Sequence, residues 1–359
     1  MQRQLLASFG KCSVAEVVRT LCGVQAQVAS SAELAIRLRQ AASRRGEVGR
    51  ALSEGSVIKT WAMRGTLHLV APEVAGSFLS LLAAGRSWER PSWERHFGMT
   101  ARHWGLLRPA VREALSGAAL TREELATAVS ATRGLRHAGE ALRSGWGTLL
   151  KPLAWQGDLC FGPSQGSRVT FTRPELASSR WAGVPEPEAA APLAIAAYLS
   201  AYGPASAEGF SNWLSRGRVG KRLLRTWFAT LGDRVTEIEL EGQRAYVLRE
   251  HIDELASAPR QTLVRLLPGF DQWVLGPGTD DPHIVPPARR PLVSKQSGWI
   301  APTVVADGVV CATWQLDACG VRVAWFREAI RPPRVHLKAE IARLGSIVGR
   351  ELSVAVDLV

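Results

Sequence analysis

The segments SVAEVVRTLC (13–22), SAELAIRLRQ (31–40) and VIKTWAMRGTLHLV (57–70) decide the fold of the first part of the chain. In the first two, apolar residues recur at intervals of three and four, which predicts amphipathic helices. A third helix is predicted over 47–54, where Gly55 ends it. The third segment alternates after Ala62, which predicts a strand. Three helices followed by a β-ribbon is the element order of a winged helix.

Two of these helices begin with a local start signal. Ser13 with Glu16, and Ser30 with Glu33, have the spacing of a capping box, in which the two side chains bind amide groups of the first turn. Strand alternation after Ala62 divides the next residues between two faces. Met63, Gly65, Leu67 and Leu69 are expected on one face, and Arg64, Thr66 and His68 on the other.

The same order of elements is predicted twice more. A helix over 100–116, the capped segment TREELATAVSA and a helix over 147–156 lead into the short strands DLCFG and SRVTF. After the linker GVPEPEAAAP, three further helical segments precede two strands that flank the turn Glu241-Gly242. No exact sequence repeat is present, so the three winged helices are inferred from element order alone.

The composition changes beyond residue 258, where three segments are rich in strand-forming residues: 262–276, 299–316 and 321–326. A turn at Asp307-Gly308, a helix over 335–348 and a final strand follow from the same reasoning. We therefore expect an α+β fold of four domains. These are tandem winged helices at 1–98, 99–183 and 184–259, and a C-terminal small β-barrel or sheet at 260–359 with a Pro-rich basic loop.

The excess of basic residues favours two interpretations of the surface. The 44 Lys and Arg residues outnumber 32 Asp and Glu residues, for a net charge of +12, which is typical of DNA-binding proteins and also of surfaces kept basic for solubility. Five scattered cysteines without a CxxC pair favour a reducing cytoplasm over a disulfide framework or zinc site. We expect no signal peptide and no membrane span, because no apolar run is long enough.

Familiar catalytic and cofactor signatures are missing from the sequence. It contains no P-loop, no GxGxxG after a strand, no HExxH and no GxSxG, and its seven histidines are dispersed. We therefore expect no cofactor and no metal, and an enzyme built from modest functional groups.

Four ordered motifs carry a resemblance to a known family: GVQAQ (23–27), WAMRGTLHL (61–69), LLPGFDQWVLG (266–276) and GWIAPTVVADGVVCATW (298–314). Together they resemble the AlkZ- and YcaQ-like bacterial winged-helix DNA glycosylases, whereas the middle of the chain matches in element order only. The resemblance implies three winged helices in a C-shaped arrangement with a C-terminal β-domain. It also implies that Gln25 and Gln27, the family's Gln-any-Gln motif, lie in the active site.

The chemistry of the two glutamines agrees with this implication. An amide is neutral and cannot be a general base, but it can hold a water molecule. Alkylation at N7 or N3 makes a purine cationic, so the base leaves as a neutral molecule. Residues i and i+2 share a side only in extended chain, which predicts an irregular or terminal turn at Gln25 and Gln27. The alternative is two solvated polar residues in an interhelical turn.

Further candidates each have two interpretations. Arg64, Thr66 and His68 either form the polar face of a wing strand or face the DNA, with Arg64 on a phosphate and His68 near the sugar or water. Asp271 either supports the active site or caps a turn after Gly269, and the capping interpretation is favoured. After Gly276 the sequence lacks the Tyr and Arg that family members place there, which leaves any substrate contact at this point open.

Two groups of basic residues are candidate DNA contacts. Lys221, Arg222 and Arg225 lie on the last helix of the third unit, where a winged helix has its recognition helix; a solvated helical face is the alternative. Arg289, Arg290 and Lys295 lie in the Pro-rich loop. Most of the 13 tryptophans are expected in the core, although Trp61 or Trp299 would suit stacking on a base.

The resemblance and the chemistry together predict a monomeric, monofunctional DNA glycosylase of base excision repair. Its expected substrate is double-stranded DNA with alkylated purines, including bulky natural-product guanine adducts and interstrand crosslinks. The product would be an abasic site, without strand cleavage, because no lysine stands out as a Schiff-base nucleophile. Such an enzyme would act in the cytoplasm on nucleoid DNA, in antibiotic self-resistance. A non-catalytic winged-helix regulator or damage-shielding protein remains the alternative.

Overall fold

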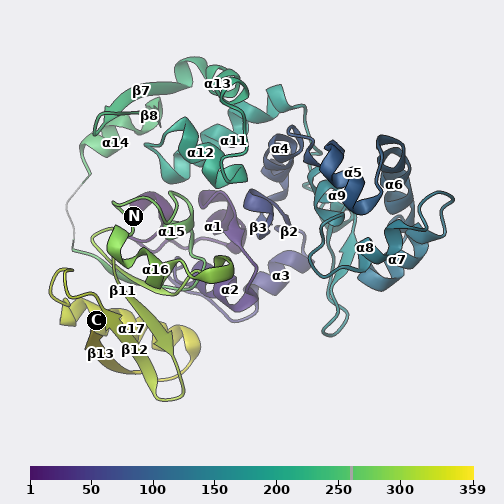
Figure 1. The fold of residues 1–359 in the computed structure, drawn as a ribbon. Helices are drawn as coiled ribbons and strands as arrows, with labels where there is room; N and C mark the ends of the chain where they lie inside the picture. Colours follow the sequence, from purple (N-terminus) through teal and green to yellow (C-terminus); the bar gives the residue numbers. More distant parts are fainter. Residues whose placement is uncertain (259–261) are drawn as a thin grey trace. The chain divides into compact units, whose positions relative to one another are not determined.

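The structure, a computed structural model, describes residues 1–258 and 262–359. Figure 1 shows the helices and strands in chain order. The chain divides into two compact units, each built from separate segments. Unit 1 comprises Met1–Glu47, Ala197–Trp213 and Asp233–Val359, and unit 2 comprises Val48–Ala196 and Leu214–Gly232. The four predicted domains stay a prediction, and the predicted boundary at 259/260 lies outside the described residues.

The first predicted winged helix has the expected order of elements. They are α1 (Val14–Thr20), the short β1 (Val24–Gln25), α2 (Ala29–Arg37), α3 (Glu47–Ser53), β2 (Ile58–Trp61) and β3 (Leu67–Val70). The capping box of Ser13 and Glu16 is confirmed, since each side chain accepts a hydrogen bond from the other residue's amide. The capping box predicted at Ser30 is wrong, because α2 begins at Ala29 with Val28 in the N-cap position.

The β-ribbon of this first set differs from the alternation in its sequence. β2 and β3 are antiparallel, with Thr60 opposite His68. Between them Met63–Gly65 forms a 3₁₀ turn, in which Arg64 and Gly65 have φ of 60° and 69°. The predicted two-faced strand is therefore wrong before Leu67, because Arg64 and Gly65 turn the chain with positive φ values that a strand does not have.

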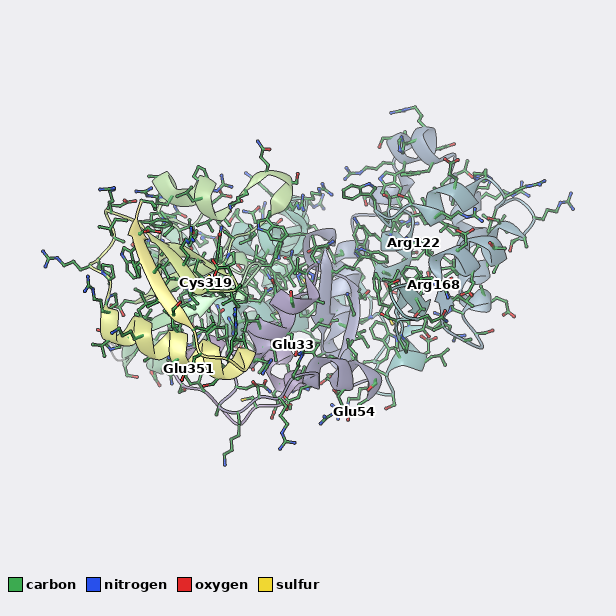
Figure 2. The ribbon with its side chains drawn as sticks, turned by 90° about the horizontal axis from the view of Figure 1, so that it is seen from below. Glu33, Glu54, Arg122, Arg168, Cys319 and Glu351 are labelled. Atoms are coloured by element: carbon green, nitrogen blue, oxygen red, sulfur yellow. The ribbon has the colours of Figure 1, made fainter. Side chains whose placement is uncertain are left out.

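Unit 2 continues with the helices and strands of the second set. They are α4 (Pro72–Ala83), α5 (Pro91–Phe97), α6 (Ala101–Ala114), β4 (Leu120–Thr121), α7 (Arg122–Ser130), α8 (Ala138–Arg143), α9 (Leu150–Trp155), β5 (Cys160–Phe161), β6 (Thr170–Thr172) and α10 (Pro174–Ala177). The predicted capping box of Thr121 and Glu124 is confirmed. Within this unit the strands follow in the order β3-β2-β5-β6-β4. Trp61, Leu150 and Phe171 share one hydrophobic core, and the guanidinium of Arg122, labelled in Figure 2, lies 5.2 Å from the centre of the Phe171 ring.

The third set also has the predicted order. Its elements are α11 (Pro187–Tyr202), α12 (Ala207–Ser215), α13 (Lys221–Ala229), β7 (Val235–Leu240), β8 (Gln243–Leu248) and the added α14 (Ile252–Ala256). Glu241 and Gly242 have φ of 49° and 76°, as a two-residue hairpin turn between twisted strands requires. Three helices thus precede a pair of strands in the first and third sets, whereas the second set has additional helices before β5 and β6. The number of true winged helices stays a prediction.

The C-terminal sheet lies in unit 1 and is open. Its strands are β9 (Val264–Leu267), β10 (Thr303–Ala306), β11 (Val309–Leu316), β12 (Gly320–Trp325) and β13 (Ser353–Leu358), in the order β13-β12-β11-β10-β9. The helices of this region are α15 (Gln272–Leu275), α16 (Arg290–Val293) and α17 (Arg334–Val348). β9 and β13 form two separate edges, so the β-barrel interpretation is wrong and the sheet interpretation is confirmed. The segment after Gly269, expected to be β-rich, forms α15.

Both faces of this open sheet are covered by apolar side chains. Leu266 and Val304 belong to a core shared with α17 on one face. Leu267 and Val305 belong to a second core, which receives Phe270 from the segment after β9. Successive residues of β9 and of β10 therefore pack into different cores on opposite faces of the sheet, which explains why these strands are continuously apolar in sequence. β12 and β13 are parallel, and α17 provides the crossover that parallel pairing needs.

A buried ion pair joins the end of α2 to the start of α15. Arg39 and Asp271 are 0% and 1% exposed, and the guanidinium donates two hydrogen bonds to the carboxylate, at 2.8 and 2.7 Å. Arg39 also donates to the carbonyl oxygens of Gln4 and Ala35. Asp271 in addition accepts from the Trp273 amide, which confirms the capping interpretation. The sequence analysis did not predict the partner of this carboxylate.

Replacing Asp271 by Asn is expected to lower the free energy of unfolding by about 3 kcal/mol or more, because the Arg39 charge would stay buried without its counter-charge. Asparagine still caps a helix, so the change isolates the charge. The double variant Arg39→Met/Asp271→Asn is expected to cost less than the sum of the single changes. Thermal denaturation followed by circular dichroism measures these effects.

The matched control for this experiment is Arg244→Met, which breaks the exposed ion pair with Glu237. Exposed pairs contribute about 0–1 kcal/mol. Equal losses of Tm in Asp271→Asn and Arg244→Met would contradict the prediction.

Candidate functional site

The two glutamines of the GVQAQ segment lie between α1 and α2. Cys22 and Gly23, with φ of 56° and 101°, turn the chain out of α1. Val24 and Gln25 then form β1, and Gln27 lies in a bend before α2. The segment is thus extended at Gln25 and irregular at Gln27, directly before a helix begins, which agrees with the irregular or terminal turn predicted from the sequence. Gln25 is 6% exposed and Gln27 is exposed, so the interpretation as two solvated residues does not describe Gln25.

A tyrosine of α11 anchors the chain just before the glutamines. The Tyr202 hydroxyl lies within hydrogen-bond distance of the Leu21 carbonyl oxygen and, at 3.3 Å, of Oε1 of Gln272. Gly276 packs closely on the same tyrosine, because a Cβ there would lie 2.1 Å from the ring. Sequence analysis missed Tyr202, whose partner is 181 residues away along the chain and leaves no local pattern.

The start of α2 packs against the segments that contain two other motifs. Val28 contacts the hydrophobic cluster that includes Phe270 and Ile300. Gly269 permits a close approach here, since a Cβ at this position would lie 2.7 Å from the Ile300 carbonyl oxygen and 3.8 Å from Oγ of Ser31. Unit 1 therefore brings together GVQAQ, LLPGFDQWVLG and GWIAPTVVADGVVCATW, three of the four motifs.

The electrostatic character of this end of α2 is positive. The first turn of the helix contains no acidic residue, and the aliphatic side chain of the N-cap residue Val28 offers no acceptor to the amide groups. The N-terminal end of a helix carries a partial positive charge. This end of α2 is therefore suited to a DNA phosphate, while the Gln27 side chain itself carries no charge.

The candidates of the fourth motif, WAMRGTLHL, lie in unit 2 at the β2–β3 turn. Arg64 and Thr66 are partly exposed, and His68 is 0% exposed. Nδ1 of His68 lies 3.0 Å from the Thr66 carbonyl oxygen, so this nitrogen carries the hydrogen of the neutral ring. Burial, followed by the charge of Arg64, lowers the pKa of His68 to about 3. His68 is therefore neutral at physiological pH, and it holds the turn that contains Arg64.

The predicted DNA-contacting cations differ in their surroundings. Three of them are exposed along α13: Lys221, Arg222 and Arg225. In the Pro-rich loop, Arg289 binds both carboxylate oxygens of Glu328 at 2.6 and 2.7 Å, and Arg290 lies 2.7 Å from the Asp280 carboxylate. Two of the three loop charges are thus compensated by neighbouring carboxylates, whereas Lys295 is exposed.

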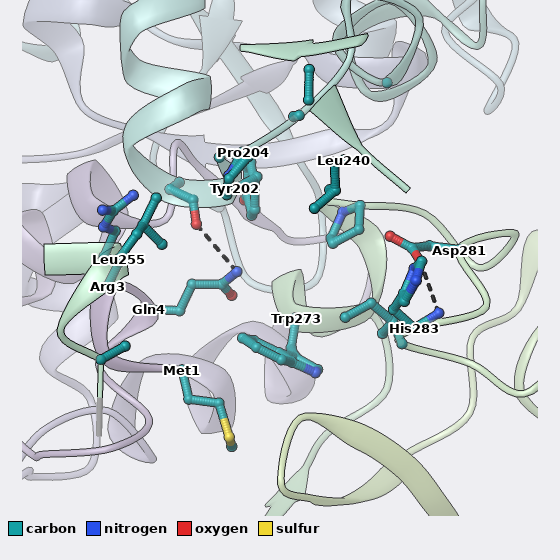
Figure 3. Close-up of a pocket in the computed structure, with 18 of the residues that line it drawn as sticks. Met1, Arg3, Gln4, Tyr202, Pro204, Leu240, Leu255, Trp273, Asp281 and His283 are labelled. Atoms are coloured by element: carbon teal, nitrogen blue, oxygen red, sulfur yellow. Dashed lines mark hydrogen bonds and ion pairs between the residues drawn. The ribbon is translucent and has the colours of Figure 1, made fainter. Parts of the chain in front are cut away.

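A cavity of about 1170 Å³ in unit 1 is separate from the glutamine segment. Gln4, Trp273 and His283 are among its lining residues, as Figure 3 shows, and neither glutamine of the GVQAQ segment is. His283 is hydrogen-bonded to Asp281 and to Glu241 at 2.9 Å each, and these two carboxylates raise the pKa of His283. We therefore place the candidate site at the glutamines and not in this cavity.

Two further features are absent from residues 1–258 and 262–359. Across these ranges, His, Cys, Asp and Glu side chains form no group of three or more suited to a metal ion. No helix in the same ranges has the length and apolar character needed to cross a membrane.

Comparison with known proteins confirms the resemblance carried by the motifs. The family model of the AlkZ-like DNA glycosylases matches residues 18–347. The chain is 47% identical over 350 residues to an interstrand DNA cross-link repair glycosylase of Streptomyces sahachiroi. The match covers 97% of this chain and 94% of the relative. The solved structure of Streptomyces sahachiroi DNA glycosylase AlkZ matches with a TM-score of 0.95 and 46% identity, over 100% of this chain and 97% of that one.

These matches decide between the two functions that the sequence left open, and favour the enzyme over the non-catalytic DNA-binding protein. The chain belongs to the AlkZ-like family of DNA glycosylases, hydrolases that cleave the bond between a base and its deoxyribose in DNA.

Proposed function

We propose that this DNA glycosylase removes cationic purines alkylated at N7 or N3 from duplex DNA, with Gln25 and Gln27 positioning the attacking water. One observation carries the proposal. The two carboxamides lie in a single extended-to-irregular segment that is anchored at Leu21 before it and at Val28 after it. A fixed segment of neutral dipoles is suited to orienting water rather than to transferring protons.

The reaction follows from the charge of the damaged base. The bond between C1′ and N9 breaks, and its electron pair passes to the purine, which neutralises the positive charge and lets the base leave without an acid. The oxygen of a water molecule bonds to C1′, and one of its protons passes to solvent. Glutamine oxygens accept hydrogen bonds from this water and support the partial positive charge on the sugar.

Bulky guanine adducts and interstrand crosslinks fit the same chemistry. Each purine of a crosslink alkylated at N7 carries the charge that makes it a good leaving group, so cleavage at one end unhooks the two strands. The relative from Streptomyces sahachiroi is named for the repair of such lesions, and the chain covers 94% of it. We include both substrate classes in the proposal, and cleavage in each case leaves an abasic site and an unbroken strand.

DNA phosphates are expected to contact the exposed cations of α13, Lys221, Arg222 and Arg225. Arg64 at the β2–β3 turn and Lys295 in the loop are further candidates, whereas the ion pairs of Arg289 and Arg290 make these two weaker ones. We propose that the enzyme acts as a monomer on chromosomal DNA in the cytoplasm.

Replacing Gln27 by Ala is expected to lower the rate of base release at least about 100-fold, because a water without its orienting group attacks poorly. Gln27 is exposed, so this change should leave the Tm and the affinity for DNA unaltered. Single-turnover release from DNA with N7-methylguanine, revealed as alkali-labile abasic sites, measures the rate. Gln25→Ala is tested beside it, with its Tm.

The matched control for the glutamines is Gln165→Ala, a change at an exposed loop of unit 2. Undiminished release by Gln27→Ala and Gln25→Ala would overturn the assignment of the glutamines. Release that is absent for the unaltered protein, on both N7-methylguanine and crosslinked DNA, would overturn the proposed substrate.

No group of the enzyme is expected to impose a pH dependence on base release between about pH 6 and 8, because amides do not titrate in this range. The lowered pKa of His68, about 3, keeps this side chain neutral throughout. Single-turnover rates at constant ionic strength measure the profile. A change of slope near pH 6.5 that disappears in His68→Asn would contradict the prediction.

A further inference from the structure

One exposed tryptophan of unit 1 contacts the hydrophobic cluster against which Val28 also packs. Trp299 is 48% exposed, and Trp146 in unit 2 is 83% exposed, whereas Trp61, the other tryptophan considered for stacking, is 5% exposed in its core. Tryptophan has the largest apolar surface of all side chains and is mostly buried on average. The stacking interpretation is therefore excluded for Trp61 and open for Trp299.

The loop 294–300 holds Trp299 in a defined position. Ser294 and Ile300 form a β-bridge, and the Lys295 amide donates to the Trp299 carbonyl oxygen at 2.8 Å. Ser297 and Gly298 between them have positive φ values of 59° and 74° and make the reversal. The loop is thus a small hydrogen-bonded hairpin that presents an indole and, four residues earlier, an exposed lysine.

The indole of Trp299 packs against the ring of a buried phenylalanine, Phe270. The rings of Trp299 and Phe270 are in an edge-to-face arrangement, with centroids 5.1 Å apart and planes at 78°. Phe270 is 6% exposed and has a left-handed φ of 64°, which is unfavourable for a bulky residue. This backbone conformation places the phenylalanine in the core directly before Asp271, whose ion pair with Arg39 fixes the same segment.

The same hydrophobic cluster connects Trp299 to the proposed active site. Phe270 and Ile300, the ring partner and the chain neighbour of Trp299, pack in the cluster that also contacts Val28. Val28 directly follows Gln27. The exposed indole and Val28, the residue after Gln27, are therefore in contact with the same apolar cluster of unit 1.

We propose that Trp299 stacks on a nucleobase that is unstacked from the duplex when the damaged nucleotide is brought to Gln25 and Gln27. This inference rests on the proposed function. Reaching C1′ of a nucleotide in a duplex disturbs base stacking, which costs a few kcal/mol. An aromatic side chain replaces the lost stacking partner whatever the base, and Lys295 in the same hairpin is placed to contact a phosphate of the same strand.

The test compares three substitutions of Trp299 on duplex DNA with N7-methylguanine, a lesion that brings no aromatic plane besides the bases. Trp299→Phe keeps a stacking face, Trp299→Leu keeps an apolar contact with Phe270 without a stacking face, and Trp299→Ala removes both. Single-turnover release is expected to fall roughly ten-fold in the Leu and Ala variants and to be largely retained in the Phe variant. Trp146→Ala is the matched control and is expected to be unchanged.

A second readout does not depend on catalysis. 2-Aminopurine placed next to the lesion brightens when it is unstacked and is quenched when it stacks on an indole. Binding of the unaltered protein should therefore give a quenched signal, and Trp299→Leu a brighter one. A merely structural role would instead lower the Tm of the Leu variant and leave the fluorescence of bound DNA unchanged, which would overturn the proposal.

The remaining outcomes separate this inference from the proposed function. If Gln27→Ala abolishes release while Trp299→Leu matches the unaltered protein in rate and fluorescence, the stacking role is wrong and the glycosylase proposal stands. If release from N7-methylguanine is retained in Trp299→Leu and only a bulky aromatic adduct is affected, the indole recognises the adduct and the nucleobase assignment is wrong. Absence of release by the unaltered protein tests the proposed substrate, while the 2-aminopurine signal still decides the stacking.

Discussion

The buried ion pair between Arg39 and Asp271 is the constraint on which the arrangement of unit 1 depends. Moving two charges out of water costs several kcal/mol per ion, so the pair is stable only where both groups have a full set of partners. Arg39 has them in the carboxylate and in two carbonyl oxygens, of Gln4 and Ala35, and Asp271 has in addition the Trp273 amide. A shift of α2, of the N-terminal turn or of α15 would break at least one of these bonds. The three segments are therefore tied to one arrangement.

That arrangement determines where the glutamine segment lies, because α2 is a short rigid rod of nine residues. Arg39 fixes the chain just after its last turn, and Val28 fixes it just before the first. Tyr202 holds the preceding turn at Leu21. The intervening residues have few ways to move, which suits a site whose proposed task is to orient one water molecule. The hydrophobic cluster that contacts Val28 also contains Phe270, the ring partner of Trp299. One cluster thus helps to position both the glutamines and the proposed stacking residue.

Local sequence patterns correctly predicted those elements whose stability depends on interactions between residues close together in the chain. The capping boxes at Ser13 and Thr121 were predicted correctly, as were the tight hairpin turns and α17, because each depends on residues a few positions apart. The alternation of apolar and polar residues around Arg64 led to a wrong prediction of a strand, because the residues of this turn alternate in the same way. Arg39 lies beyond the end of α2 but continues the helical spacing of the buried Ala35 and Ile36, and a charge in such a spacing needs a counter-ion when it is buried. Its partner, 232 residues away, is set by tertiary packing and has no local signal.

The proposed reaction explains why a neutral segment suffices in this enzyme. An undamaged purine is a poor leaving group, and its removal needs an acid to protonate the base. A purine alkylated at N7 or N3 already carries the charge that such an acid would supply, and a fixed cation beside it would only repel it. In the proposed reaction two carboxamides orient water without adding charge of either sign, and discrimination against undamaged DNA would arise from the leaving group itself. Under this proposal, selection by the charge of the leaving group requires no close fit around the adduct, so the same site is expected to act on small and bulky N7 adducts alike.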